Sequence, residues 1–288
     1  MRPETLEQYI NSRHTDQTAK TYLYYIGVFK MKYPNAMLLM YSDIIQYINI
    51  IKIHTTEVSK ISPHFSAVKR YYDYLLETGQ RNDHPCRSIN LKRKRKPIQL
   101  QDLFSPSELA ELMNRENRFA NLELRNKVII SLLIHQALVC SELCRLEIRD
   151  IDLDTGTIYV KGSPKNASRT LDLRQNQIML IQNYINTSRK NLLKCASNYL
   201  LITQRGVAET VDGIHSMIEP LKGLFMDRNL TPSTIRQSVI SNLLNINKQP
   251  LDVVQIFAGH KYPSSTEQYR RKDINDQLEK INRWHPLK

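Results

Sequence analysis

The sequence predicts a mainly α protein that contains one small antiparallel sheet and divides into two helical domains. Three observations support this fold class. Apolar residues recur at helical spacing through most of the 288 residues. One strand-turn-strand pattern occurs, between residues 157 and 173, and a basic segment containing a proline separates two halves that each show apolar periodicity. A chain of this length can form two domains with a core in each.

Residues 1–90 are expected to form a small helical bundle. Their apolar side chains recur three or four residues apart between residues 15 and 76. One helix is expected to begin at Ser62-Pro63 and to end at Gly79, which are common start and stop residues. Lys69 and Arg70 lie away from the apolar stripe of this helix. They are interpreted as a solvated surface or, together with the basic segment that follows, as a surface that faces DNA.

The segment LKRKRKPIQLQD, residues 91–102, is expected to link the two domains because it is basic and its proline disfavours a helix. The whole chain has 41 Lys and Arg against 28 Asp and Glu, a formal charge of +13, so nucleic acid is the first expected partner. A basic linker holds phosphates without reading sequence. The residues expected to do so are Lys92, Arg93, Lys94, Arg95 and Lys96.

Residues 103–288 are expected to form a larger α-rich domain. A helix begins at Ser105-Pro106, where Glu108 completes something close to a capping pattern. A long helix from Leu124 to Leu146 is apolar almost all round, so it is expected at the centre of the core.

The small sheet is expected in the middle of this second domain. It is expected to consist of a strand from Thr157 to Val160, a turn at residues 162–166 and a returning strand from Arg169 to Leu173. Helices are expected to follow at Gln177–Lys194, Gly213–Met226 and Thr234–Asn245, with an amphipathic one after Tyr269.

Several other classes of protein are disfavoured. Apolar runs such as VIISLLI, residues 128–134, are too short to cross a bilayer, and the N-terminal MRPETLEQYI lacks a secretory pattern, so a cytoplasmic, nucleoid-associated protein is expected. Cys140 and Cys144 lie one helical turn apart, with His135 further back, but no second ligand pair completes a metal site; buried thiols are expected instead. No glycine-rich phosphate loop predicts a nucleotide cofactor.

Four motifs follow one another along the second half of the chain: ALVCSEL, a strand-turn-strand bearing lysines, LTPSTIRQS, and AGHKYPSSTEQY. Together with the helical first half and the basic linker, they resemble the tyrosine recombinase, or phage integrase, family over nearly the whole chain. Gly259-His260, followed by Tyr269 nine residues after the histidine, is the most specific match. The resemblance implies attack by a tyrosine on a DNA phosphodiester, a 3′-phosphotyrosyl intermediate, a free 5′-hydroxyl, and no metal or cofactor.

The resemblance also implies roles for particular residues. Tyr269 stands at the nucleophile, His260 at the second histidine and Arg236 at the second arginine. The general acid belongs to the strand turn, where Lys165 is preferred and Lys161 is the alternative. A tyrosine with a pKa near ~10 needs such cations and a proton acceptor in order to react at neutral pH.

Two members of the family set are replaced. Val139 stands where the first arginine is expected, and losing such a donor costs on the order of 10²–10³ in rate. Of the residues within a helical turn on the same face, His135 alone can carry positive charge, so Lys161, Arg169 and Arg149 are the candidate substitutes.

The first histidine is replaced by Ser233, in the first turn of a helix capped by Thr231. A hydroxyl there can donate to a phosphate but cannot act as a base, which leaves that role to His260.

Two functions follow from this pattern. The first is an active strand transferase that mobilises or resolves a genetic element. The second is a DNA-binding accessory or regulatory protein that has lost cleavage and directs a partner recombinase. In the tail, an apolar stripe at Ile274, Leu278, Ile281 and Trp284 indicates docking, either on its own domain or, as the resemblance implies, on a neighbour within a tetramer.

Overall fold

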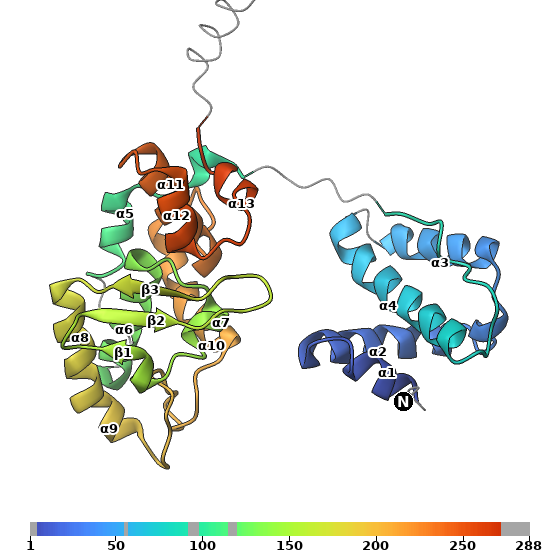
Figure 1. Cartoon of the computed structure of the whole chain (residues 1–288), viewed down its shortest axis with the longest axis horizontal. Helices are drawn as coiled ribbons and strands as arrows, with labels where there is room; N and C mark the ends of the chain where they lie inside the picture. The colour runs from blue at the N-terminus through green and yellow to red at the C-terminus, as the bar shows by residue number, and fades with distance from the viewer. Residues whose placement is uncertain (1–4, 55–56, 92–97, 115–119, 272–288) are drawn as a thin grey trace, which may run out of the picture. The chain divides into compact units, whose positions relative to one another are not determined.

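The computed structural model describes residues 5–54, 57–91, 98–114 and 120–271 (Figure 1). The chain separates into two compact units, which we call the N-terminal unit, Met1–Lys96, and the C-terminal unit, Pro97–Lys288. The finer domain limits expected from the sequence, with a linker over residues 91–102, remain a prediction. Residues 92–97 and the predicted docking stripe of the tail lie outside the described residues.

The N-terminal unit is a helical bundle with an aromatic-rich core. Its helices are α1 (Leu6–Asn11), α2 (Asp16–Lys32), α3 (Tyr41–His54) and α4 (Val58–Glu77). The Tyr72 ring is fully buried beside Phe29, and its hydroxyl donates to the carbonyl of Ala36 at 2.7 Å. The expected helix start at Ser62-Pro63 is wrong, because α4 begins a turn earlier. Ile61 is buried one turn before Phe65, so packing keeps the preceding turn helical despite the proline.

The C-terminal unit packs its helices against one face of a three-stranded antiparallel sheet (Figure 1). The strands β1 (Ile151–Asp152), β2 (Thr157–Val160) and β3 (Arg169–Asp172) pair in sequence order, with Thr157 opposite Asp172 and Val160 opposite Arg169. The helices are α5 (Pro106–Glu111), α6 (Glu123–His135), α7 (Cys140–Leu143), α8 (Gln175–Asn186), α9 (Ser188–Leu192), α10 (Val211–Ile218), α11 (Pro232–Asn245), α12 (Leu251–Ala258) and α13 (Ser264–Glu267). The predicted mainly α class with a small antiparallel sheet is confirmed.

The expected single helix from Leu124 to Leu146 is wrong. Helix α6 ends at His135, and the chain turns before α7 begins at Cys140. Ala137 has a left-handed conformation with φ 49°, and the amide of Leu138 reaches back to the Leu132 carbonyl, which is a common way to end a helix. No glycine or proline marks this turn. The apolar pattern continues across it, and for that reason the sequence predicted one helix instead of two.

Two other expected helices are each divided. The helix expected over residues 177–194 bends at Thr187 into α8 and α9. The helix expected over residues 213–226 is α10 followed by a 3-10 segment, Glu219–Leu224, because Pro220 removes a helical donor. Helix α11 begins at Pro232, where the Thr231 hydroxyl accepts from the amide of Thr234 at 3.0 Å.

Candidate active site

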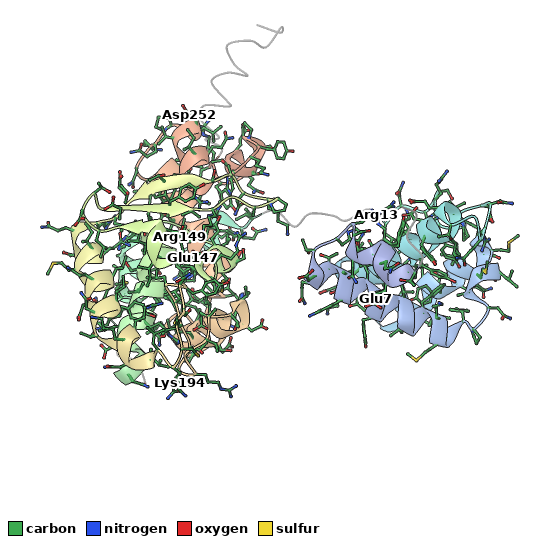
Figure 2. The ribbon with its side chains drawn as sticks, turned by 60° about the horizontal axis from the view of Figure 1, so that its bottom comes forward. Glu7, Arg13, Glu147, Arg149, Lys194 and Asp252 are labelled. Carbon is green, nitrogen blue, oxygen red and sulfur yellow. The ribbon has the colours of Figure 1, made fainter. Side chains whose placement is uncertain are left out.

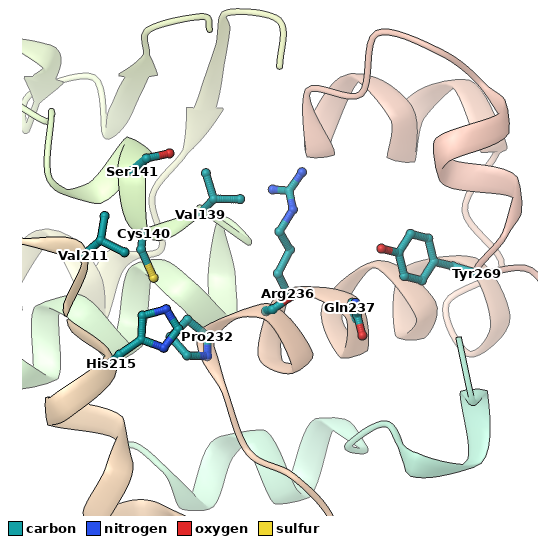
Figure 3. A pocket seen from close by; sticks show the side chains of 10 residues that line it. Val139, Cys140, Ser141, Val211, His215, Pro232, Arg236, Gln237 and Tyr269 are labelled. Carbon is teal, nitrogen blue, oxygen red and sulfur yellow. The ribbon is translucent and has the colours of Figure 1, made fainter. Parts of the chain in front are cut away.

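A pocket of about 370 Å³ brings together segments far apart in the sequence (Figure 3). One wall is the turn before α7 and its first residues, and a second is the N-terminal half of α11. Helix α10 packs against both of these helices and supplies a third wall. The lining residues are Val139, Cys140, Ser141, Val211, His215, Pro232, Ser233, Arg236, Gln237 and Tyr269.

Arg236 is the buried cation of this pocket. Its guanidinium donates from Nη1 to the carbonyl of Ala137 and from Nη2 to the carbonyl of Ala258, at 2.5 Å for the second bond. The first carbonyl lies in the turn after α6 and the second belongs to the last residue of α12, so the guanidinium is held by two separate segments. Burial lowers the pKa of Arg236 to about 10, which still leaves the group charged at neutral pH. Arg236 is therefore a fixed positive charge that needs no rearrangement to meet an anion.

Tyr269 follows α13 and is 7% exposed. Its ring packs with a small apolar cluster from α11 and α12 and lies nearly parallel to the His260 ring, with centroids 6.3 Å apart. The side-chain amide of Asn245 donates from Nδ2 to the backbone carbonyl of Tyr269 at 2.8 Å. Burial raises the pKa of the phenol, and the charge of Arg236 works against that rise. In the free protein the hydroxyl is thus protonated and needs an acceptor before it can attack.

His260 lies beside the Tyr269 ring and carries an imidazole with a lowered pKa. Its Nδ1 pairs with the Thr266 hydroxyl at 2.8 Å, which orients the ring. Desolvation, followed by the charges of Arg236 and Arg169, lowers the pKa of His260 to about 4. The imidazole is therefore neutral at physiological pH, and a neutral imidazole can accept a proton.

A buried ion pair lies behind the pocket and joins the β2-β3 hairpin to α7. Arg169 from β3 donates to both carboxylate oxygens of Glu142, at 2.9 and 3.0 Å, and the two side chains are 2% and 1% exposed. The same carboxylate accepts from the Val139 amide and the Asn166 side chain, each at 3.0 Å. Burial would raise the pKa of Glu142, but the bonds and charge of Arg169 outweigh it and lower the pKa.

The glycine of the Gly-His motif is explained by this ion pair. Gly259 has a left-handed conformation, φ 69°, and a Cβ atom there would lie 2.6 Å from Nη1 of Arg169. Its carbonyl accepts from the Ala167 amide at 2.9 Å. The guanidinium of the β3 arginine thus passes beside the backbone that carries His260, and only glycine leaves room for it.

None of the cations expected to replace the first arginine lines the pocket. Lys161 pairs with Glu147 at 2.9 Å, and Arg149 is exposed and pairs with the same carboxylate (Figure 2). Arg169 donates to the same Glu142 carboxylate that accepts from the Val139 amide. The negative charge of that carboxylate neutralises the positive charge of Arg169. The His135 expectation is wrong, because α6 ends before residue 139 and His135 lines a different cavity.

The other expected catalytic residues are placed differently. Ser233 lines the pocket in the first turn of α11, one turn before Arg236. Lys165 is exposed in the turn between β2 and β3 and is not among the pocket residues. Its backbone amide is held by the Ser163 hydroxyl at 3.2 Å.

The expected DNA-binding residues of the N-terminal unit are only partly available. Lys69 donates to the carbonyl of Ile89 at 2.7 Å and lies over the Phe65 ring, so its ammonium is engaged within its own unit. Arg70 is exposed and pairs with Asp73 at 2.8 Å. The basic residues Lys92 to Lys96 lie outside the described residues.

Sequence reasoning missed His215, which lines the same pocket as Arg236 and Tyr269. It is an exposed residue on α10, a helix that carries no family motif, so no local signal marked it. Cys140, on the α7 wall next to His215 in Figure 3, is a buried thiol whose pKa burial raises to about 11. Among the described residues there is no cluster of metal-ligating side chains, and no helix long and apolar enough to span a membrane.

Comparisons with known proteins agree on one family. Residues 102–276 match the model of the phage integrase family. The chain is 25% identical over 258 residues to tyrosine recombinase XerC of Halalkalibacterium halodurans, covering 88% of this chain and 84% of that protein. It is 30% identical over 224 residues to tyrosine recombinase XerD of Yersinia pestis, covering 76% and 73%. The fold matches the Tn1549 transposon integrase bound to a circular intermediate DNA, with a TM-score of 0.72, 13% identity and coverage of 98% and 99%.

Proposed function

Because the chain belongs to the phage integrase family, we propose that it recombines DNA at specific sites through a 3′-phosphotyrosyl intermediate on Tyr269. The observation that carries this proposal is the convergence of Tyr269 and Arg236 on one pocket, with His260 stacked on the tyrosine ring. These residues come from separate segments of the chain and have no shared structural need for a phenol, an imidazole and a guanidinium. Their chemistry fits transfer of a phosphoryl group.

The proposed reaction assigns one task to each group. Arg236 holds the non-bridging oxygens of the scissile phosphate, where charge grows in the transition state. Tyr269 attacks phosphorus and passes its proton to His260, which is neutral at physiological pH. The bond to the 5′-oxygen breaks as that oxygen takes a proton from the hairpin lysine.

For this last step Lys165 is the better candidate, since Lys161 is held by Glu147 and Asp150. The turn that carries Lys165 is exposed and can approach bound DNA. Ser233, at the N-terminal turn of α11, contributes a hydroxyl to the phosphate in place of a histidine.

The proposal extends to binding and assembly. Double-stranded DNA is the substrate, gripped by the basic linker from Lys92 to Lys96 and by the α4 surface around Lys69 and Arg70. The working form is a homo-tetramer on two paired DNA sites, or an assembly with a partner recombinase, held by the apolar stripe of residues 273–284. Such a protein acts in the cytoplasm, at the nucleoid. Truncation after Lys272 should then weaken pairing of sites more than binding to one site.

The test is a nicked suicide duplex taken from the DNA that flanks the protein's own gene. The wild-type chain is expected to form a covalent protein-DNA adduct that resists denaturing gels. Tyr269→Phe should bind the same duplex and form no adduct. Binding by the wild type without an adduct would contradict the proposal.

A second variant tests whether the natural protein is an active enzyme or a cleavage-deficient accessory protein. Val139→Arg restores the guanidinium that the family places at this position. If cleavage appears only in this variant, the natural protein is an accessory factor. If the wild type already cleaves, and the variant changes the rate little or lowers it, another cation already serves the phosphate.

A further inference from the structure

His215 lies on the wall of the pocket opposite the nucleophile, Tyr269. In Figure 3 the Arg236 side chain lies between His215 and Tyr269, and Val139 lies on the side of the pocket nearer to His215. A phosphate held by Arg236 would therefore have the phenol at one side and the imidazole at the other.

The pocket is short of positive charge. Of the ten residues that line it, Arg236 and His215 are the two whose side chains can be cationic. The family places another arginine and another histidine at this site, but at those positions the chain has Val139 and Ser233, which are both uncharged. An imidazole can take up a proton near neutral pH, and a bound phosphate favours the protonated form.

The position of His215 is well defined by its helix. The Thr210 hydroxyl caps α10 by accepting from the Gly213 amide at 3.0 Å, and Ile214 and Ile218 are buried beneath the helix. Helix α10 packs against α7 and α11, which carry the two other walls. The His215 side chain is exposed, and in the described part of the chain no hydrogen bond or ion pair holds it. Its ring is thus available to a ligand at a fixed place.

From these observations we propose that His215 donates a hydrogen bond to a non-bridging oxygen of the scissile phosphate and supplies a positive charge in this pocket beside that of Arg236. This inference rests on the proposed function and deepens it. His215 forms no covalent bond in the reaction. It stabilises the charge that develops while the bond from Tyr269 to phosphorus forms and the bond to the 5′-oxygen breaks.

Two substrate analogues make this role separable from the others. In a methylphosphonate a methyl group replaces one non-bridging oxygen, so the scissile group is neutral and no longer requires a second cation. In a 5′-bridging phosphorothiolate the leaving sulfur needs no general acid. The first analogue should relieve a missing cation, and the second a missing proton donor.

The experiment measures the rate of adduct formation by full-length protein on suicide duplexes with each scissile group. His215→Gln is expected to slow cleavage of the ordinary phosphodiester by about 10²-fold and cleavage of the methylphosphonate by no more than about threefold. His215→Lys keeps a charge and should retain most of the activity. Lys165→Met should be restored by the phosphorothiolate instead.

Two control variants leave the pocket-lining residues unchanged. Ser216→Ala alters the next exposed residue of α10, and Lys222→Gln removes a positive charge outside the pocket; neither should show rescue by the methylphosphonate. The inference is overturned if His215→Gln is unimpaired, equally slow on both substrates, or rescued by the phosphorothiolate. Those results leave wild-type cleavage, and with it the proposed function, intact. Absence of any adduct from the wild type would overturn both.

Discussion

Arg169→Met is expected to destabilise the C-terminal unit strongly, because it leaves a buried carboxylate without its cation. Removing one partner of a buried ion pair costs about 3–5 kcal/mol. Methionine occupies a similar volume, so the effect is electrostatic. Glu142 keeps its bonds from the Val139 amide and the Asn166 side chain, which places the loss at the lower end, about 3 kcal/mol. For a unit of this size that lowers Tm by roughly 6–12 °C.

Differential scanning calorimetry of the full chain checks this value. Arg149→Met is the matched control, since Arg149 is exposed and pairs with Glu147 in the same unit; it should lose at most about 1 kcal/mol. The double variant Glu142→Leu with Arg169→Met should recover part of the loss, because no charge remains buried. The reasoning is refuted if Arg169→Met shifts Tm no more than Arg149→Met does.

Two further predictions concern the Gly-His motif. Gly259→Ala forces a left-handed alanine and a clash with Arg169, so it should lose at least about 1–2 kcal/mol in the same calorimetric assay and slow adduct formation. The pKa of His260 is depressed to about 4, so folding favours its neutral form. Stability should be complete above the ordinary histidine pKa near ~6.5 and decline as pH falls from there toward 4. His260→Asn should show a smaller decline in Tm over that range, and an equal decline would contradict the assignment.

The family and the fold class could be predicted from the sequence because their signals are local. The Gly-His and tyrosine spacing, the capped start of α11 and the alternation of β2 and β3 each depend on a few neighbouring residues. The break between α6 and α7 could not be predicted, since Ala137 adopts a conformation that more often marks glycine. That error also placed His135 on the same helical face as residue 139, whereas His135 lines a different cavity.

Pairings over long sequence distances also escaped prediction. Lys69 resembles a free basic residue in the sequence, but it binds the carbonyl of Ile89. Arg169 was one of three candidate cations, and only its partner Glu142 explains both its burial and the glycine at position 259. Charge balance depends on which side chains meet, and periodicity carries no information about that.

The sequence alone determined the chemical inventory of this protein: a tyrosine, a histidine and an arginine in the order of a known family, with two expected members replaced. Only the tertiary structure decided how that inventory is arranged. Helix α10 brings His215 into the pocket from a segment without any motif, and α6 ends in time to turn the Ala137 carbonyl toward Arg236. Motifs arise from contacts between near neighbours, whereas an active site is completed by packing among helices far apart in the chain.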